Sequence, residues 1–430
     1  MENDNLHLDV YKNHSELHNN GTVTFFEEGP QNEDTLARYQ YICNAFKGGF
    51  YESVMKDLSV ELYNEKLTPE QQNMIKGLVD GLTSEVGRAI VGLTCLQLAI
   101  KSIKIDQSIR LHKGGSNRRN GFSWREGISM RSLDSMFNTP FLREFGLLNI
   151  NKDGIMMTRS LAENYPYSQL YKAEIRGPVK NWIDIVEALE NKSLLPYPGL
   201  CYLLSLLKNR SDSFKSKVVT VVNLAKEMQE FKFETIKTIL ISFFNNAEYS
   251  ARAFEVVIHC FMQALSEQKL IDGELVPLSQ MRSANKKHGN IGDIEVKRGN
   301  MIIESWDAKY GKPYLRDELE ELNDKLYNHP NVEIAGFIVN SQVDLRQDIK
   351  NRVQEIGDLH KCEILLLTID EWIEKKTSKM PSNVLDTLGY NWIIAVAESF
   401  GQKRTTIAPI DEPCEVWIDE LLNHIQEAKQ

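Results

Sequence analysis

The sequence predicts an α/β protein, with a C-terminal mixed sheet flanked by helices and a mainly helical part before it. From Asn246 onward, helical apolar spacing alternates with short apolar runs that are typical of strands. Between residues 178 and 245, apolar residues recur every three or four positions, which indicates helix. At 430 residues the chain is too long for one ordinary domain, so we expect separate N- and C-terminal cores.

Three regions follow from these patterns. We expect a mainly helical region at residues 1–240, an α/β domain at 241–405 and a helical tail at 406–430. The first 35 residues are polar and are expected to be loosely ordered. A helix is expected to begin after Thr68, because Pro69 and Gln71 complete a capping pattern.

Residues from about 105 to 170 predict a winged-helix-like segment. Helical spacing through Leu133 and Phe137 is followed by the runs LLNI and IMMT, which flank a turn sequence at residues 151–154. Two helices and a hairpin in this order resemble a winged helix. A plain helix–hairpin packing unit is an equally good interpretation.

Composition limits the class of protein. Hydrophobic residues make up 42% of the chain and charged residues 26%, as in soluble globular proteins. The longest apolar stretch, Ala89 to Ile100, is shorter than the ~20 residues of a membrane span, so no membrane partner is expected. The six cysteines have no C-x-x-C spacing, and the N-terminus MENDNLHLDV lacks a secretory pattern. We therefore expect neither disulfides nor a cysteine zinc cluster, and a cytoplasmic location.

Basic residues cluster locally although the net charge is −10. Nine Lys and Arg stand against three acids between Lys101 and Arg143, a local excess of six positive charges. Such a cluster with interleaved aromatics is typical of a DNA-binding surface, where Arg reads bases and Lys neutralises phosphates. The DNA-binding candidates, which include two lysines of the loop MRSANKKHGN, are Lys113, Arg118, Arg119, Arg125, Arg131, Lys286 and Lys287. Solvated charged loops are the alternative interpretation.

The stretch GDIEVKRGNMIIESWDAKYGK, residues 292–312, predicts a β-hairpin. Strand alternation places Ile303, Ser305, Asp307 and Lys309 on one face, and Ile302, Trp306 and Ala308 on the other. Ile294 must face the core with Trp306, so Asp293 lies on the face of Asp307. A two-residue turn at Gly299-Asn300 alone would mispair these faces. One extra residue, in the turn or as a bulge, pairs Asp293 with Asp307.

Two opposed carboxylates predict a cation between them. Oxygen ligands of this kind suit Mg²⁺ or Mn²⁺, and the carbonyl of Ala308 is a candidate third ligand beside Asp293 and Asp307. Lys309 is placed to hold or deprotonate an attacking water. A metal with an activated water is the equipment for phosphodiester hydrolysis.

An acid on one strand followed by acid-x-Lys on the next, here Asp293 and then Asp307-Ala308-Lys309, resembles the PD-(D/E)xK nuclease superfamily, particularly type II restriction endonucleases. The resemblance covers about residues 246–400 and includes the helix–strand order. It implies a restriction-endonuclease-like sheet and a further acid on the preceding helix, which is Glu255, with Arg252 one turn before it. Gly292 stands where the family pattern has Pro.

Several alternatives stay open at the site. Glu255 can also be an ordinary solvent-facing glutamate. Glu295 shares the face of Asp307 but lies farther along its strand, and Glu304 is assigned to the face of Trp306. Zinc-hydrolase and nucleotide-binding motifs are lacking in the sequence, so no nucleotide cofactor is expected.

The sequence therefore predicts a Mg²⁺-dependent endonuclease that cuts double-stranded DNA at a specific site. One active site cuts one strand, so a symmetric target favours a homodimer. The alternatives are a non-catalytic, sequence-specific DNA-binding regulator and a repair or modification-dependent nuclease.

Overall fold

The computed structural model describes residues 6–19, 21–58, 63, 65–82, 85–115, 121–148, 150–171, 173–278, 290–312, 315–342, 346–401 and 414–430. The chain forms two compact units, Met1–Ser213 and Phe214–Gln430, and their boundary falls inside helix α9 (Pro196–Lys226). The C-terminal unit thus begins earlier than residue 241, because the end of α9 packs in the C-terminal core. Within the described ranges, no helix has the length and apolar character that crossing a membrane requires.

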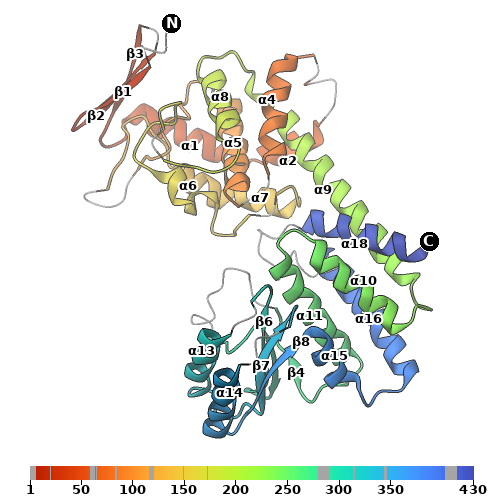
Figure 1. The fold of residues 1–430 in the computed structure, drawn as a ribbon. Coiled ribbons are helices and arrows are strands. Elements are labelled where there is room, and N and C mark those ends of the chain that lie inside the picture. Colours follow the sequence, from red (N-terminus) through yellow and green to blue (C-terminus); the bar gives the residue numbers. More distant parts are fainter. Residues whose placement is uncertain are drawn as a thin grey trace, which may run out of the picture. The chain divides into compact units, whose positions relative to one another are not determined.

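The N-terminal unit is mainly helical, as predicted (Figure 1). Its main helices are α1 (Glu33–Lys47), α2 (Phe50–Lys56), α4 (Pro69–Asp80), α5 (Glu85–Ile103), α6 (Met130–Leu133), α7 (Thr139–Glu144), α8 (Val179–Glu190) and the first part of α9. A π-helical turn, η1 (Asp134–Asn138), joins α6 to α7. The capping box that opens α4 is confirmed, since Thr68 and Gln71 exchange side-chain and backbone hydrogen bonds of 3.3 and 3.1 Å.

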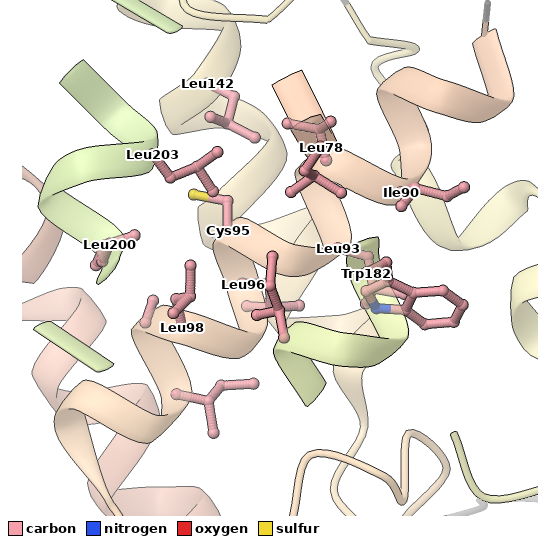
Figure 2. Close-up of a cluster of buried hydrophobic side chains, with 14 of the residues drawn as sticks. Leu78, Ile90, Leu93, Cys95, Leu96, Leu98, Leu142, Trp182, Leu200 and Leu203 are labelled. Carbon is pink, nitrogen blue, oxygen red and sulfur yellow. The ribbon is translucent and has the colours of Figure 1, made fainter. Parts of the chain in front are cut away.

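Helix α5 lies at the centre of this unit because it is apolar on nearly every side. Figure 2 shows Leu93 and Leu96 of α5 and Trp182 of α8 in this packed core. The one polar group of Trp182, Nε1, donates to Oε1 of Gln97 at 2.8 Å, so burying the indole leaves no donor unpaired. This core is separate from the sheet of the C-terminal unit.

The N-terminal residues expected to be loosely ordered instead form a three-stranded antiparallel sheet. Its strands are β1 (His7–Val10), β2 (His14–Asn19) and β3 (Thr22–Glu27). Leu17 and Phe26 form its buried face and pack on Leu111 and Trp124. The expectation was wrong because these tertiary partners lie about a hundred residues away, where local polarity gives no hint of them.

The hairpin predicted around residues 151–154 is also wrong, and with it the wing. The turn exists, since Gly154 N donates to Asn151 O at 3.0 Å, but the chain continues as a 3₁₀ helix, η2 (Ile155–Met157), and not as a strand. Ile155 is buried against Gly92 of α5, and its amide donates to Oδ2 of Asp134 at 2.7 Å. Burial of the apolar run against a helix thus outweighs its strand propensity.

The C-terminal unit confirms the predicted α/β class, with a five-stranded mixed sheet in the order β4-β5-β6-β7-β8. The strands are β4 (Glu274–Leu275), β5 (Ile294–Arg298), β6 (Met301–Lys309), β7 (Ile334–Val339) and β8 (Glu363–Thr368). Strands β4, β5 and β6 are antiparallel neighbours, while β6, β7 and β8 run parallel. The parallel strands are joined through helices, as parallel connections require.

Helices cover both faces of this sheet (Figure 1). One face packs on α13 (Arg316–Leu326) and α14 (Gln347–His360). The other face packs on α11 (Ser250–Glu267), α15 (Ile369–Thr377) and α16 (Ser382–Gly401), with α10 (Phe233–Asn246) and α18 (Cys414–Lys429) completing that core. Helix α18 is therefore part of the core, because Trp417, Leu421 and Ile425 are buried in it.

Candidate active site

The β5–β6 hairpin has the predicted register. Ile294 pairs with Trp306, and the hairpin closes through a two-residue turn with Arg298 opposite Met301. The extra residue is Ile303, which forms a bulge on β6 because Val296 pairs with Glu304 while Lys297 pairs with Ile302. The bulge restores the pairing of faces that the short turn alone would break.

The bulge reverses the predicted faces of Ile303, the bulged residue, and of its neighbour Ile302. Ile303 packs in the core that contains Trp306, whereas Ile302 packs on the opposite face with residues of α13 and α14. Strict alternation assigns them the other way round, and the inserted residue reverses the alternation. The predicted faces of Asp307 and Lys309 are unaffected, because both residues follow the bulge on β6, in the part of the strand whose register was set by the pairing of Ile294 with Trp306.

Asp293 is held directly against the end of β6. Its Oδ2 accepts a hydrogen bond from the amide of Ala308 at 3.1 Å. The N–H and C=O of one strand residue point to the same side, so the carbonyl of Ala308 also points toward the Asp293 side. The preceding residue is Gly292, where a Cβ would lie 2.6 Å from the carbonyl oxygen of Trp306. A residue with a side chain, including the Pro of the family pattern, therefore does not fit in this backbone arrangement.

Asp307 and Lys309 form an ion pair on one face of β6. Lys309 Nζ lies 2.9 Å from Oδ2 of Asp307, and the two side chains are 22% and 15% exposed. Burial raises the pKa of Asp307, but the hydrogen bond with Asp293 and the charge of Lys309 outweigh it and bring the pKa below its usual value. Burial lowers the pKa of Lys309, and the charge of Asp307 more than reverses this, so its pKa is raised. Lys309 is therefore an ammonium ion at neutral pH.

The pKa of Asp293 is shifted in the opposite direction to that of Asp307. Burial, followed by its hydrogen bond with Asp307 and the negative charges of Asp307 and Glu255, raises the pKa of Asp293 well above its usual value. Two close carboxylates cannot both ionise cheaply, so Asp293 holds its proton to a higher pH than an isolated carboxyl does when no cation is bound. A divalent ion between Asp293 and Asp307 would replace that proton.

Glu255 lies near this pair without closing a three-carboxylate cluster. It projects from α11, is mostly buried, and forms an ion pair with Arg252 on the preceding turn. The negative charge of Glu255 contributes to the raised pKa of Asp293, after burial and Asp307. Among the described residues, however, Glu255, Asp293 and Asp307 do not form a group in which all three ligand atoms lie within 4.8 Å of one another.

The two other acids of the hairpin have different surroundings. Glu295 is 2% exposed, and its Oε1 accepts from the amides of Ile291 at 2.6 Å and Gly292 at 3.4 Å. It thus fixes the backbone immediately before Asp293. Glu304 forms an ion pair with Lys376 and accepts from the indole of Trp306, on the face away from Asp307, as predicted.

Two charged residues of α13 also belong to this neighbourhood, and sequence reasoning missed them. Glu318 and Lys325 line a small cavity together with Ser305 and Asp307. The charge of Lys325 helps to lower the pKa of Asp307, and that of Glu318 helps to raise the pKa of Lys309. Their seven-residue spacing, which puts both on one helix face, is the signal that the sequence carried.

The predicted DNA-binding residues have mixed surroundings. Lys113 is half-buried and donates to Asn164, and burial lowers its pKa, with a contribution from the charge of Arg131. Arg131 donates to the carbonyl of Met156 at 2.9 Å, and Arg125 pairs with Glu27 at 3.1 Å. The remaining candidates, Arg118, Arg119, Lys286 and Lys287, lie outside the described residues.

Several residues of the basic cluster form ion pairs and hydrogen bonds inside the N-terminal unit. Arg110 forms a two-pronged pair with Glu187, with contacts of 2.8 and 2.5 Å, and donates to the carbonyl of Tyr167. Lys101, 4% exposed, lies 3.3 Å from Glu190. Both acids belong to α8, which the local charge count does not include. The excess of six positive charges is therefore smaller at the surface than the sequence suggests.

All the ligand atoms that converge at the Asp293–Asp307 pair are oxygens. Two carboxylates and a backbone carbonyl suit hard divalent cations such as Mg²⁺. The raised pKa of Asp293 agrees, because burial and then the nearby negative charges disfavour its ionised form, which a cation would stabilise. No family model matches this chain, and no curated protein matches its sequence.

Proposed function

We propose that this chain is a metal-dependent endonuclease of the PD-(D/E)xK type that hydrolyses phosphodiester bonds in double-stranded DNA at a specific sequence. The observation that carries the proposal is the convergence of Asp293, Asp307 and Lys309 at the end of one hairpin. Buried groups with opposed pKa shifts are typical of functional sites, because the folded chain gains nothing in stability from crowding like charges.

Asp293, Asp307 and the carbonyl of Ala308 are the residues that would hold Mg²⁺, with Mn²⁺ as a substitute. When bound, the ion would polarise a phosphoryl oxygen and make water a better nucleophile. Asp293 must lose its proton to bind the ion. The hydrogen bond from the amide of Ala308 keeps the carboxylate oriented toward the proposed metal site. Glu255 is close enough to contribute charge and is proposed to support the metal or the water.

Lys309 is proposed to position the attacking water and to stabilise the negative charge that develops on the phosphate. Its raised pKa keeps it protonated, so it donates hydrogen bonds. Asp307 fixes the ammonium group at 2.9 Å, which orients it before substrate arrives. This is a more specific role than general base, because a protonated amine cannot accept the proton of water.

DNA is the proposed substrate, and a homodimer the proposed assembly for cutting both strands of a symmetric site. Arg125 and Arg131 are exposed enough for their side chains to reach a phosphate or a base edge, although each has an internal partner. None of the six cysteines, all of which lie in described ranges, forms a disulfide, which fits the reducing cytoplasm that we propose as the site of action.

The test is cleavage of bacteriophage DNA by the pure full-length chain with Mg²⁺. We expect discrete fragments, loss of cleavage in EDTA, and a fall of at least about 10³-fold in Asp307→Ala, because removal of a metal ligand removes most transition-state stabilisation. Glu304→Gln is the matched control, because Glu304 lies on the same strand but faces away from Asp307 and pairs with Lys376.

Two results would contradict the proposal. Fragments that persist in folded Asp307→Ala would remove the cleavage activity from this site. Tight, salt-sensitive DNA binding without cleavage in Mg²⁺ or Mn²⁺ would favour the non-catalytic DNA-binding regulator instead. Comparing methylated and unmethylated DNA separates a restriction-type enzyme from a modification-dependent nuclease.

A further inference from the structure

We propose a second metal site, for Zn²⁺ or a similar transition metal, on the outer face of the N-terminal sheet. Its ligands are His7 and Asp9 from β1 and His18 from β2, and Glu16 of β2, which lies outside this close group of three but 3.4 Å from Nε2 of His18, is the candidate fourth. Among the described residues, His7, Asp9 and His18 are the one group of three such side chains with ligand atoms all within 4.8 Å of one another. The site is remote in sequence from the proposed nuclease residues and does not depend on their function.

Strand register brings these four residues together. His7 pairs with His18, and Asp9 pairs with Glu16, in the antiparallel β1–β2 ladder. Side chains two apart on a strand share a face, so all four project from the face opposite buried Leu17. The sequence HLDVYKNHSELH shows no familiar zinc spacing, because the ligands come in pairs from two strands. This explains why motif reading finds no metal site here.

The distances from His18 and Asp9 to their neighbours fit a tetrahedral ion. Nε2 of His18 lies 3.5 Å from Oδ2 of Asp9 and 3.4 Å from Oε2 of Glu16, and Nε2 of His7 lies 3.6 Å from Oδ2 of Asp9. Ligands about 2.1 Å from a tetrahedral ion are separated from one another by about 3.4 Å. Octahedral Mg²⁺ would need neighbouring ligands about 3.0 Å apart, and it prefers oxygen. Two imidazoles and two carboxylates therefore select a tetrahedral metal of the zinc type.

The surroundings of His18 also favour a bound cation. Nε2 of His18 is shielded from solvent and makes no hydrogen bond to a described residue, although it faces two carboxylates. A shielded polar atom without a hydrogen bond is costly, and coordination would satisfy it.

One neighbour, His14, and the stacking of two ligand rings determine how the ligands are oriented. His14 Nε2 lies 3.0 Å from Oε1 of Glu16, which leaves Oε2 for the ion. The rings of His7 and His18 stack with centroids 4.2 Å apart and planes 10° from parallel. Because an imidazole binds metal in its own plane, both rings must tilt on binding, so metal should change their environment measurably.

Such an ion would join β1 to β2 on the side of the sheet that lacks a core. Among the described residues, the buried side rests on a small cluster of four buried side chains, Leu17, Phe26, Leu111 and Trp124. Small elements with little apolar burial are often held by a structural metal. The proposed role is therefore structural.

The test uses the full-length chain, loaded with Zn²⁺, desalted and analysed for metal content, with Co²⁺ spectra as a second readout. We expect about one Zn²⁺ per chain and the intense visible absorption of tetrahedral Co²⁺. His18→Ala and Asp9→Asn should lose both signals. His14→Gln should bind about tenfold more weakly, as expected for a residue that orients a ligand.

Two controls separate this site from others. His424→Gln removes a histidine that lies 3.1 and 3.7 Å from two glutamates but belongs to no group of three close ligands among the described residues, and zinc content should not change. Asp307→Ala should also keep its zinc, whatever happens to DNA cleavage. The proposal is overturned if the wild-type chain retains no zinc, or if His18→Ala and Asp9→Asn bind it as the wild type does.

Discussion

The amide of Ala308 donates to Oδ2 of Asp293 at 3.1 Å, across the open end of the β5–β6 hairpin. Asp293 stands just before β5, and its carboxylate takes the place of a strand partner for Ala308. This contact ties the first acid of the site to the segment that carries Asp307 and Lys309. The geometry of the candidate site therefore depends on the hairpin backbone as much as on the side chains.

Gly292→Ala should disrupt the site through the backbone. The new Cβ would lie 2.6 Å from the carbonyl oxygen of Trp306 and 2.8 Å from its carbonyl carbon, so β5 and β6 must separate locally. We expect a loss of about 1–3 kcal/mol in unfolding free energy, as for other overpacked sites, together with loss of cleavage. Urea denaturation and a cleavage assay measure the two effects.

Gly299→Ala is the matched control for that substitution. Gly299 lies in the turn of the same hairpin at φ +63°, with nothing within 4 Å of an added Cβ. It should cost about 1 kcal/mol for the left-handed conformation and leave cleavage intact. Equal activity losses in the two variants would show that the hairpin tolerates no change at all, and that the approach of Gly292 to Trp306 has no special role.

Asp293→Asn should make the metal-free protein more stable at neutral pH. Asn keeps the shape of the side chain and can still accept from Ala308, but it cannot ionise beside Asp307. Because burial and Asp307 raise the pKa of Asp293, ionising this carboxyl costs folding free energy, on the order of 1 kcal/mol or more. Thermal denaturation in EDTA at pH 7.5 should show a higher melting temperature for the variant.

The same comparison has a defined pH dependence. Below the unfolded-state pKa, about 3.9, the carboxyl is neutral in both states and costs nothing. The cost grows as pH rises from there through the raised folded-state pKa, and it is constant above both. The advantage of Asp293→Asn should thus shrink toward pH 4. Asp324→Asn, at an exposed position on α13, should show no such trend, and a pH-independent advantage would contradict the assigned pKa of Asp293.

Lys309→Met should separate chemistry from metal binding. The ammonium lies 2.9 Å from Asp307, so removing it takes away a positive charge that opposes a cation. We expect Mn²⁺ affinity to stay equal or increase, while the cleavage rate falls by about 10²-fold or more. Single-turnover cleavage and Mn²⁺ titration measure the two quantities. Full cleavage by this variant would remove Lys309 from the mechanism.

The sequence was sufficient to predict the hairpin and its acids, because Ile294 and Trp306 must both be buried and so determine which side chains share a face. It did not place the extra residue, since a longer turn and a bulge at Ile303 satisfy that requirement equally. The contributions of Glu318 and Lys325 were missed because they depend on how α13 packs against the sheet.

Other features depended on contacts that local patterns do not contain. The N-terminal sheet has a hairpin signal, Asn20-Gly21 between two alternating runs, but its polar composition obscured it. The basic cluster looked like a DNA surface because Arg110 and Lys101 find their acids on α8, about eighty residues away. Charge counts along a sequence do not identify such partners.

Mn²⁺ binding, followed by electron paramagnetic resonance at several pH values, tests the central claim most directly. The account predicts that the wild type and Glu304→Gln bind Mn²⁺, more tightly as pH rises and Asp293 loses its proton, and that Asp293→Asn and Asp307→Asn bind at least about tenfold more weakly. Equal Mn²⁺ affinity in all four proteins would contradict it, because the two aspartates would then hold no metal.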